Sequence, residues 1–363
     1  IYVMAYRYHN GIGVPQNCEL ALYYYTQISH AGMKLLANLR NKDESLEEYL
    51  SYDLRLPDFN GGLYGNHASE SKLTVVNNEE RFNENIEYLN RHGSNANIEY
   101  IDCYKEALIY YYGDYFNPRN YSKAFETLLG CVDISDLSKQ HKSFRNLDSI
   151  EQPIVSYSLS LLGHMFLKGY GVEQDYEMAY KVLKISLKVM NNPMALADLG
   201  WMHEHSVLEQ TSNVTAAFDY YWSAGTASST MAMAKLMLKS TPDNMYFQIR
   251  DKKQFYDCVK LAAFNHNTEA VFMFGELLLN SFAQEVEPDV EVTCDSTILY
   301  YKHCAELLEK YFFPHLKYAF EEFNNKRYKN SLLGYAMAAE QGILNAQVLA
   351  AFLLHQPKPL LGK

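Results

Sequence analysis

A recurring spacing between helix-capping residues constrains the fold of this chain more than any other feature. Asp175, Asn213, Asp251, Thr293 and Arg327 follow one another at intervals of 38, 38, 42 and 34 residues, although Arg327 is a poor cap. A small residue usually lies four positions after each cap, and a small pair lies at eleven and twelve. Self-similarity with this period predicts a solenoid of paired helices. Such a protein presents an extended surface to other macromolecules.

The first helix of each expected pair has its own pattern, in which a small residue precedes a bulky residue by four positions. Ala195 precedes Leu199 in this way, and Gly200 follows directly, as Gly163 does in the preceding repeat. A spacing of four places both residues on one face of a helix. Glycine inside a helix costs about 1 kcal/mol relative to alanine, so its recurrence indicates close packing of helices.

Two of the expected links between helices have the form Gly-x-Gly-Val. They begin at Gly11 and Gly169, and each reaches a capping residue six positions later, at Asn17 or Asp175. Glycine adopts the left-handed conformation that ends a helix without a steric penalty. The second glycine of each link then allows a tight turn into the next helix.

These residues resemble the Sel-1-like repeat, a relative of the tetratricopeptide repeat. The segment 162–175 follows the repeat pattern almost throughout, and residues 338–346 resemble the junction between two repeats. The resemblance covers about residues 1–32 and 103–363, and it implies an all-α fold, an α/α superhelical solenoid with a concave face. The positions that carry it are Gly11, Gly13, Gly163, Gly169, Gly171, Asp175, Ala179, Gly200, Ala217, Ala338, Ala339 and Gly342.

The repeat pattern is interrupted twice, which suggests a division into five segments. We expect a first repeat in residues 1–40, an insertion or degenerate repeat in 41–100, and another repeat in 101–132. A polar stretch, 133–153, reads as a linker that ends at Pro153. Residues 154–363 then form a C-terminal block of repeats. Because residue 1 already lies inside the first repeat, we expect the chain to be a fragment.

The net charge of the chain makes some classes of binding partner unfavourable. The formal net charge of −11 weighs against nucleic acid or an anionic membrane surface as the principal partner. The sequence shows no signal peptide and no apolar run long enough to span a membrane.

The six cysteines lack the spacings of a metal site, but two of them are placed to meet. Cys103 lies near the start of a first helix, and Cys131 lies near the end of the second helix that follows. Antiparallel neighbours bring these ends together, so a disulfide worth about 3 kcal/mol is geometrically feasible. The alternative is that both are buried thiols in small-residue positions.

Two N-glycosylation sequons are present, at Asn120-Tyr121-Ser122 and Asn213-Val214-Thr215. If used, they place the chain in the secretory pathway. The alternative is structural, because both Asn120 and Asn213 occupy expected capping positions, where asparagine is favoured in its own right.

The sequence offers little that could support catalysis or bind a cofactor. His203 and His205 are two residues apart, and on a helix such residues point to different faces, so we expect no metal site there. The chain lacks a nucleophile elbow, a phosphate-binding glycine loop and an HExxH motif. We therefore expect a protein that is not an enzyme and needs no cofactor.

The composition, the sequons and the break into blocks resemble the lumenal part of the adaptor of an HRD-type ubiquitin ligase. This resemblance implies a scaffold in the endoplasmic reticulum that stabilises a membrane-embedded ligase and recruits misfolded proteins for ER-associated degradation. The implied partners include an ER lectin and misfolded glycoproteins, with a membrane anchor outside this fragment. The alternatives are a cytosolic scaffold of the same repeat type, such as an activator of a cell-wall synthase, and a repeat-bearing hydrolase.

Overall fold

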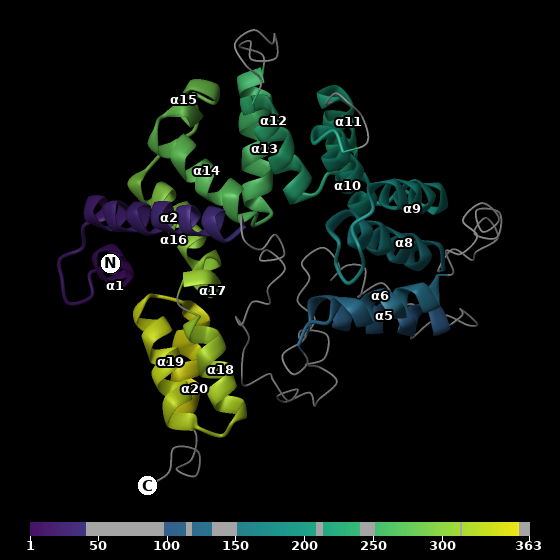
Figure 1. Cartoon of the computed structure of the whole chain (residues 1–363). Coiled ribbons are helices and arrows are strands. Elements are labelled where there is room, and N and C mark those ends of the chain that lie inside the picture. The colour runs from purple at the N-terminus through teal and green to yellow at the C-terminus, as the bar shows by residue number, and fades with distance from the viewer. Residues whose placement is uncertain are drawn as a thin grey trace. The chain divides into compact units, whose positions relative to one another are not determined.

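The computed structural model describes residues 1–40, 98–113, 118–132, 151–207, 213–239, 251–312 and 314–355, and the regular elements in these ranges are all helices. The all-α repeat fold expected from the sequence is confirmed. The chain forms two compact units: unit 1 comprises residues 1–73 and 247–363, and unit 2 comprises residues 74–246 (Figure 1). The sequence does not indicate this division, because the block expected at 154–363 is shared between the two units.

Unit 2 consists of antiparallel helix pairs in chain order, followed by one further helix. Two apolar clusters form their core, one that includes Leu128, Leu159 and Leu162 and a second that includes Leu183 and Leu199. The helices among the described residues of this unit are α5 (Ile98–Tyr112), α6 (Tyr121–Cys131), α8 (Glu151–Lys168), α9 (Tyr176–Val189), α10 (Pro193–Glu204), α11 (Val214–Ala224) and α12 (Ala227–Lys239).

Unit 1 is built from the two ends of the chain. Its N-terminal part contributes α1 (Tyr2–Asn10) and α2 (Cys18–Arg40), and α2 packs along a helix of the C-terminal part. The remaining helices are α13 (Asp251–Phe264), α14 (Thr268–Leu279), α15 (Phe282–Val286), α16 (Cys294–Leu307), α17 (Glu309–Phe312), α18 (His315–Asn324), α19 (Tyr328–Glu340) and α20 (Leu344–His355).

Most of the expected capping residues lie directly before the second helices, whereas Asp251 is itself the first residue of α13. The side chains of Asn120, Asp175 and Asn213 each accept a hydrogen bond from the backbone N–H three residues later, at 2.9–3.0 Å. Thr293 forms a reciprocal capping box with Ser296, whereas Arg327 makes no capping bond through its side chain. Each such bond satisfies a donor that the first turn of a helix would leave free, a contribution of about 1 kcal/mol.

The buried positions of the second helices lie at fixed distances in sequence from the capping residues. The residues four positions later are buried, among them Ala21, Ala124, Ala179 and Ala217, which have no exposed surface. The residues eight positions later are buried as well and hold larger side chains, a regularity that the sequence analysis does not single out. They are Tyr25, Leu128, Leu183, Tyr221, Val259, Tyr301 and Tyr335.

Glycines in the first helices face these larger side chains. A Cβ atom at Gly163 would lie 2.7 Å from the Leu183 side chain, and one at Gly200 would lie 2.7 Å from the Tyr221 ring. The helices of a pair therefore approach closely only because these positions lack a side chain. In the links, Gly11, Gly13, Gly169, Gly171 and Gly342 have positive φ, while near the last of them Ala338 is buried and Ala339 is half-buried.

The boundaries of the expected insertion and linker move inward by a few residues. Helix α5 begins at Ile98, so residues 98–100 are helical, and α8 begins at Glu151, so residues 151–153 of the expected linker are helical. Pro153 lies in the first turn of α8, where its missing N–H group removes no hydrogen bond. The rest of both segments, 41–97 and 133–150, lies outside the described residues.

Candidate functional site

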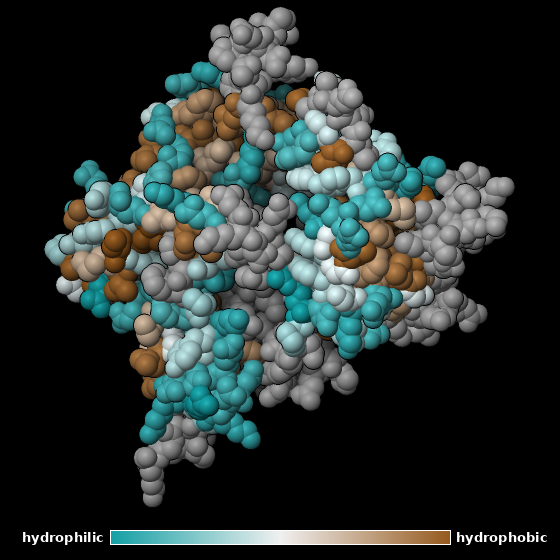
Figure 2. Space-filling view, in the orientation of Figure 1, coloured by the Kyte–Doolittle hydropathy of each residue, from teal (hydrophilic) through white to brown (hydrophobic). Residues whose placement is uncertain are grey.

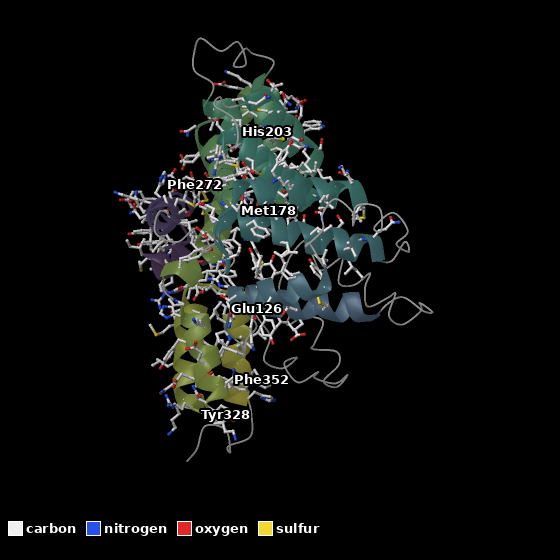
Figure 3. The ribbon with its side chains drawn as sticks, turned by 45° about the vertical axis from the view of Figure 1, so that its right-hand side comes forward. Glu126, Met178, His203, Phe272, Tyr328 and Phe352 are labelled. Carbon is white, nitrogen blue, oxygen red and sulfur yellow. A yellow bond between two sulfur atoms is a disulfide. The ribbon has the colours of Figure 1, made fainter. Side chains whose placement is uncertain are left out.

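The N-terminal helix pair occupies a site on the C-terminal part of unit 1. Ala5 and Tyr25 are fully buried in one apolar cluster with Ile298 and Tyr301 of α16, and Phe272 of α14 packs against it (Figure 3). Residues separated by more than 270 positions therefore share a core. In a simple solenoid each repeat contacts only its neighbours in sequence. Unit 1 departs from that rule.

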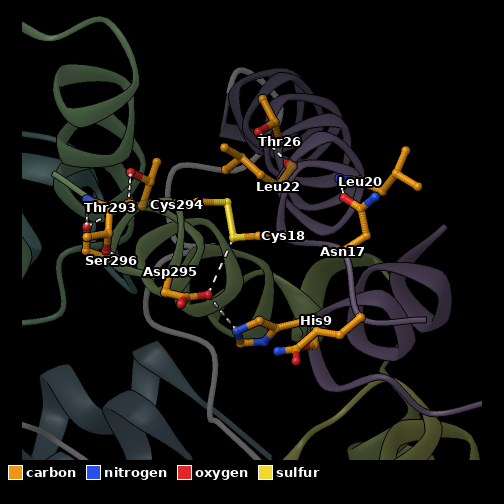
Figure 4. Close-up of a disulfide and its surroundings, with 12 residues drawn as sticks. His9, Asn17, Cys18, Leu20, Leu22, Thr26, Thr293, Cys294, Asp295 and Ser296 are labelled. Carbon is orange, nitrogen blue, oxygen red and sulfur yellow. Dashed lines mark hydrogen bonds and ion pairs between the residues drawn. A yellow bond between two sulfur atoms is a disulfide. The ribbon is translucent and has the colours of Figure 1, made fainter. Parts of the chain in front are cut away.

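A disulfide between Cys18 and Cys294 joins the two parts of this site, with the Cα atoms 6.2 Å apart (Figure 4). Each cysteine is the first residue of its helix and directly follows a cap, Asn17 or Thr293. The sequence analysis missed this pair. Its signal is that both cysteines occupy the same repeat position, but repeat position alone does not show that the two repeats are neighbours.

The second disulfide joins Cys103 of α5 to Cys131 of α6, the pair singled out from the sequence, with Cα atoms 5.9 Å apart. The helices are antiparallel partners, so the start of one lies beside the end of the other. The two remaining cysteines, Cys258 and Cys304, are buried thiols. Burial raises the pKa of Cys258 to about 11 and that of Cys304 to about 12, which keeps both unreactive.

Replacing both Cys103 and Cys131 by serine is expected to lower the free energy of unfolding of unit 2 by about 3 kcal/mol. The disulfide closes a loop with a sequence separation of 28, and its loss restores that entropy to the unfolded chain. Urea unfolding monitored by circular dichroism measures the change. Oxidised wild-type protein is the reference, and an equal free energy of unfolding for the variant would contradict the expectation.

Both sequons lie at accessible helix starts of unit 2. Asn120 and Asn213 are exposed, as are the hydroxyl residues Ser122 and Thr215. Each asparagine uses its Oδ1 atom for the capping bond, with Lys123 or Ala216 as donor. The Nδ2 atom, to which a glycan is attached, takes no part in that bond. Capping and glycosylation are therefore compatible at both positions.

The two histidines considered from the sequence are engaged in aromatic stacking. His203 of α10 stacks on Tyr220 with ring centroids 5.3 Å apart (Figure 3), and His205 stacks on Trp201 at 4.2 Å. Within the described ranges, no three His, Cys, Asp or Glu side chains are arranged as metal ligands. The described residues also contain no helix with the length and apolar character needed to cross a membrane.

A buried tyrosine with an acidic partner occurs in both units. Tyr221 donates a hydrogen bond to Glu204 at 2.8 Å, and Tyr301 donates one to Glu276 at 2.5 Å. Burial, followed by the nearby carboxylate, raises the pKa of both phenols well above the ordinary value. These tyrosines stay neutral and structural, since their rings fill the space beside Gly200 and Gly275.

Several large apolar side chains on the second helices point to solvent. In unit 1 they lie at the outward positions of α13, α16 and α19, and on the face drawn in Figure 2 hydrophobic residues gather over the region of α13–α15. Exposed apolar patches on a soluble protein often mark interaction sites. The most exposed examples in these helices and in α11 are Leu261, Phe264, Leu299, Leu333, Met337 and Trp222.

Comparison with known proteins identifies a repeat family and one curated relative to which this chain is similar. The Sel1 repeat family matches residues 1–33, 103–126, 156–181 and 193–227. One curated relative, the ERAD-associated E3 ubiquitin-protein ligase component HRD3 of Candida glabrata, is 24% identical over 392 residues. The match covers 98% of this chain and 44% of HRD3, so the chain spans less than half the length of that relative.

Two solved structures of similar type also match. A Sel1 repeat protein from Oxalobacter formigenes is 14% identical, with a TM-score of 0.39 over 84% of this chain and 85% of that protein. A protective antigen of uropathogenic Escherichia coli with an SLR fold is 17% identical, with a TM-score of 0.27 over 97% of this chain and 83% of the antigen.

Proposed function

We propose that this chain, a Sel1-repeat protein that resembles HRD3, serves as a non-catalytic adaptor of an ER ubiquitin ligase complex. In this role it stabilises a membrane-embedded ligase and recruits misfolded lumenal proteins for ER-associated degradation. The observation that carries the proposal is the match to HRD3, which extends over 98% of the chain. An ER lectin and misfolded glycoproteins are the further partners that the resemblance implies.

The covalent features of the structure support a lumenal location. Two disulfides, Cys18–Cys294 and Cys103–Cys131, are of the kind that persists in oxidising compartments such as the ER lumen. Two sequons lie exposed at helix starts. A cytosolic scaffold of the same repeat type would keep these four cysteines reduced, so the disulfides favour the lumenal adaptor over that alternative.

Affinity purification tests the adaptor role directly. We expect the natively expressed full-length protein, solubilised in mild detergent, to co-purify with a multispanning ubiquitin ligase. Its deletion is expected to lower the level of that ligase and to prolong the half-life of a misfolded lumenal glycoprotein. Unchanged ligase levels together with unchanged turnover of the glycoprotein would contradict the proposal.

Endoglycosidase H is expected to increase the electrophoretic mobility of the natively expressed protein by the mass of two glycans. Asn120→Asp and Asn213→Asp should each remove one glycan, because aspartate keeps the helix cap but cannot be glycosylated. Ser122→Ala and Thr215→Ala are matched controls that keep the asparagine and remove only the sequon. Unchanged mobility of the wild-type protein would assign both asparagines to capping alone and would contradict the lumenal location.

A further inference from the structure

The N-terminal helix pair is held in unit 1 by contacts with residues far away in the sequence. In the described part of the chain, α2 is followed by α5, which belongs to unit 2. Helices α2 and α16 run parallel, since their first residues form the disulfide and Ser29, further along α2, donates a hydrogen bond to the Tyr301 carbonyl at 3.0 Å. Within the described residues, the contacts that retain the pair are those of its interface with the C-terminal part of unit 1.

Polar contacts complete this interface at its edges. His30 lies 2.9 Å from Glu276 of α14, and the Gln347 side chain donates to the Tyr6 hydroxyl at 3.0 Å. Arg7 pairs with Glu340 at 2.9 Å, but both side chains are largely exposed. Exposed pairs of this kind contribute little net stability in water.

The interior of the interface is imperfectly paired. The hydroxyl groups of Tyr2 and Tyr25 and the Nδ1 atom of His9 are buried without a hydrogen-bond partner among the described residues. A buried polar group without a partner loses its hydration and gains nothing in return. The fully buried apolar residues there are two alanines, two tyrosines and one isoleucine. Partly buried side chains such as Leu22 and Ile28 pack against them, and the disulfide adds to the stability of the docked pair by closing a loop with a sequence separation of 276.

We propose that the Cys18–Cys294 disulfide is a redox-sensitive link that keeps α1 and α2 docked on α14 and α16. Both cysteines are half-buried, and the bond lies between the first turns of α2 and α16 (Figure 4). Each lies at the first position of a helix, where the helix dipole stabilises a departing thiolate, while the Asp295 carboxylate, 3.4 Å from the Cys18 sulfur, opposes that charge. The inference rests on this geometry and does not require the adaptor function.

Reduction proceeds by two thiol–disulfide exchanges with a dithiol. One thiolate of the dithiol attacks a protein sulfur, the bond between Cys18 and Cys294 breaks, and a mixed disulfide forms with release of one protein thiolate. The second thiol of the dithiol then attacks the mixed disulfide, which yields a cyclic disulfide and the second protein thiol. Two electrons and two protons pass from the dithiol to the protein.

Loss of the link would uncover a specific surface. Ile298 and Tyr301, which have no exposed surface in the docked state, would lose their cover from α2. Phe272 of α14 would lose its edge-to-face contact with His30, whose ring centroid lies 5.0 Å away. Reduction therefore converts a closed core into an accessible apolar site formed by α14 and α16.

Hydrogen exchange of the purified full-length chain, read by mass spectrometry, tests the link. In the Cys103→Ser/Cys131→Ser variant, which keeps the Cys18–Cys294 disulfide, dithiothreitol is expected to raise amide exchange in α1 and α2 by about tenfold or more, and exchange in α9 and α10 should stay unchanged. The Cys18→Ser/Cys294→Ser variant should show the same increase without reductant. The Cys103→Ser/Cys131→Ser variant is the matched control, because it loses a disulfide and keeps α1 and α2 protected until dithiothreitol is added.

Three results would overturn the proposal. One is unchanged amide exchange in α1 and α2 after a titration of thiols has shown that the Cys18–Cys294 bond is reduced. The free thiols of Cys258 and Cys304 set the thiol count before reduction in that titration. Another is a non-reducing peptide map without the Cys18–Cys294 cross-link, and the third is a cross-link between two chains. If the Cys18→Ser/Cys294→Ser variant fails to fold, reduction of the folded Cys103→Ser/Cys131→Ser variant decides the question.

Discussion

Replacing Tyr301 by alanine is expected to lower the free energy of unfolding of unit 1 by about 3–5 kcal/mol, the usual cost of truncating a large buried aromatic side chain. The ring is fully buried, it lies 6.2 Å from Phe272 between ring centroids, and its hydroxyl donates to Glu276. Truncation leaves a cavity between α14, α16 and α2. Urea unfolding together with hydrogen exchange in α14 and α16 measures the loss in this unit.

Two further variants show how much of the lost free energy of unfolding comes from the hydroxyl group and how much from burial of the ring. Tyr301→Phe keeps the ring and removes only the hydroxyl, and Glu276 retains its contact with His30, so we expect a cost of about 1 kcal/mol. Trp222→Ala removes a large side chain that is 63% exposed, and its effect should stay within about 0.5 kcal/mol. A Tyr301→Ala cost no larger than that of Tyr301→Phe would show that the ring is not a core residue.

The local part of this fold can be predicted from the sequence because it depends on short-range chemistry. Asp175 caps α9 and Ala179 is buried four residues later, since the cap fixes where the helix begins and the helix period then fixes its buried face. The meeting of Cys103 with Cys131 is local in the same sense, because an antiparallel pair brings the ends of its helices together. Arg327 makes no capping bond because its guanidinium group offers no hydrogen-bond acceptor.

The non-local part cannot be obtained in this way. Nothing in the repeat pattern shows that α2 packs on α16, since the pattern specifies each repeat and its neighbours in sequence. The Cys18–Cys294 disulfide and the division of residues 154–363 between two units follow from that long-range packing. The exposure of the Phe264 and Leu299 side chains cannot be predicted from the sequence for a related reason. Their exposure depends on which neighbour covers each helix.

Replacing Gly171 by alanine is expected to destabilise unit 2 by about 3 kcal/mol, through two costs that add. Its φ of +71° lies in the left-handed region, where a side chain costs about 1–2 kcal/mol. A Cβ atom there would also overlap the carbonyl group of Tyr121 and lie 2.7 Å from the Ser122 nitrogen. These are backbone atoms at the start of α6, so relief requires a shift of the helix itself. The stacked rings of Tyr170 and Tyr121, 4.6 Å apart, would separate as a result.

The neighbouring glycine provides the matched control for this prediction. Gly169 has nearly the same φ, +73°, but its added Cβ atom would meet the Gln174 side chain at 3.3 Å and two backbone atoms at an ordinary contact distance of 3.6 Å. Gly169→Ala should therefore cost about 1–2 kcal/mol, the conformational cost alone. Urea unfolding gives both values, and hydrogen exchange in α6 should rise only for Gly171→Ala. Equal costs for the two variants would mean that the α8–α9 link does not press against α6. The packing of successive repeats in unit 2 would then not depend on a glycine at position 171.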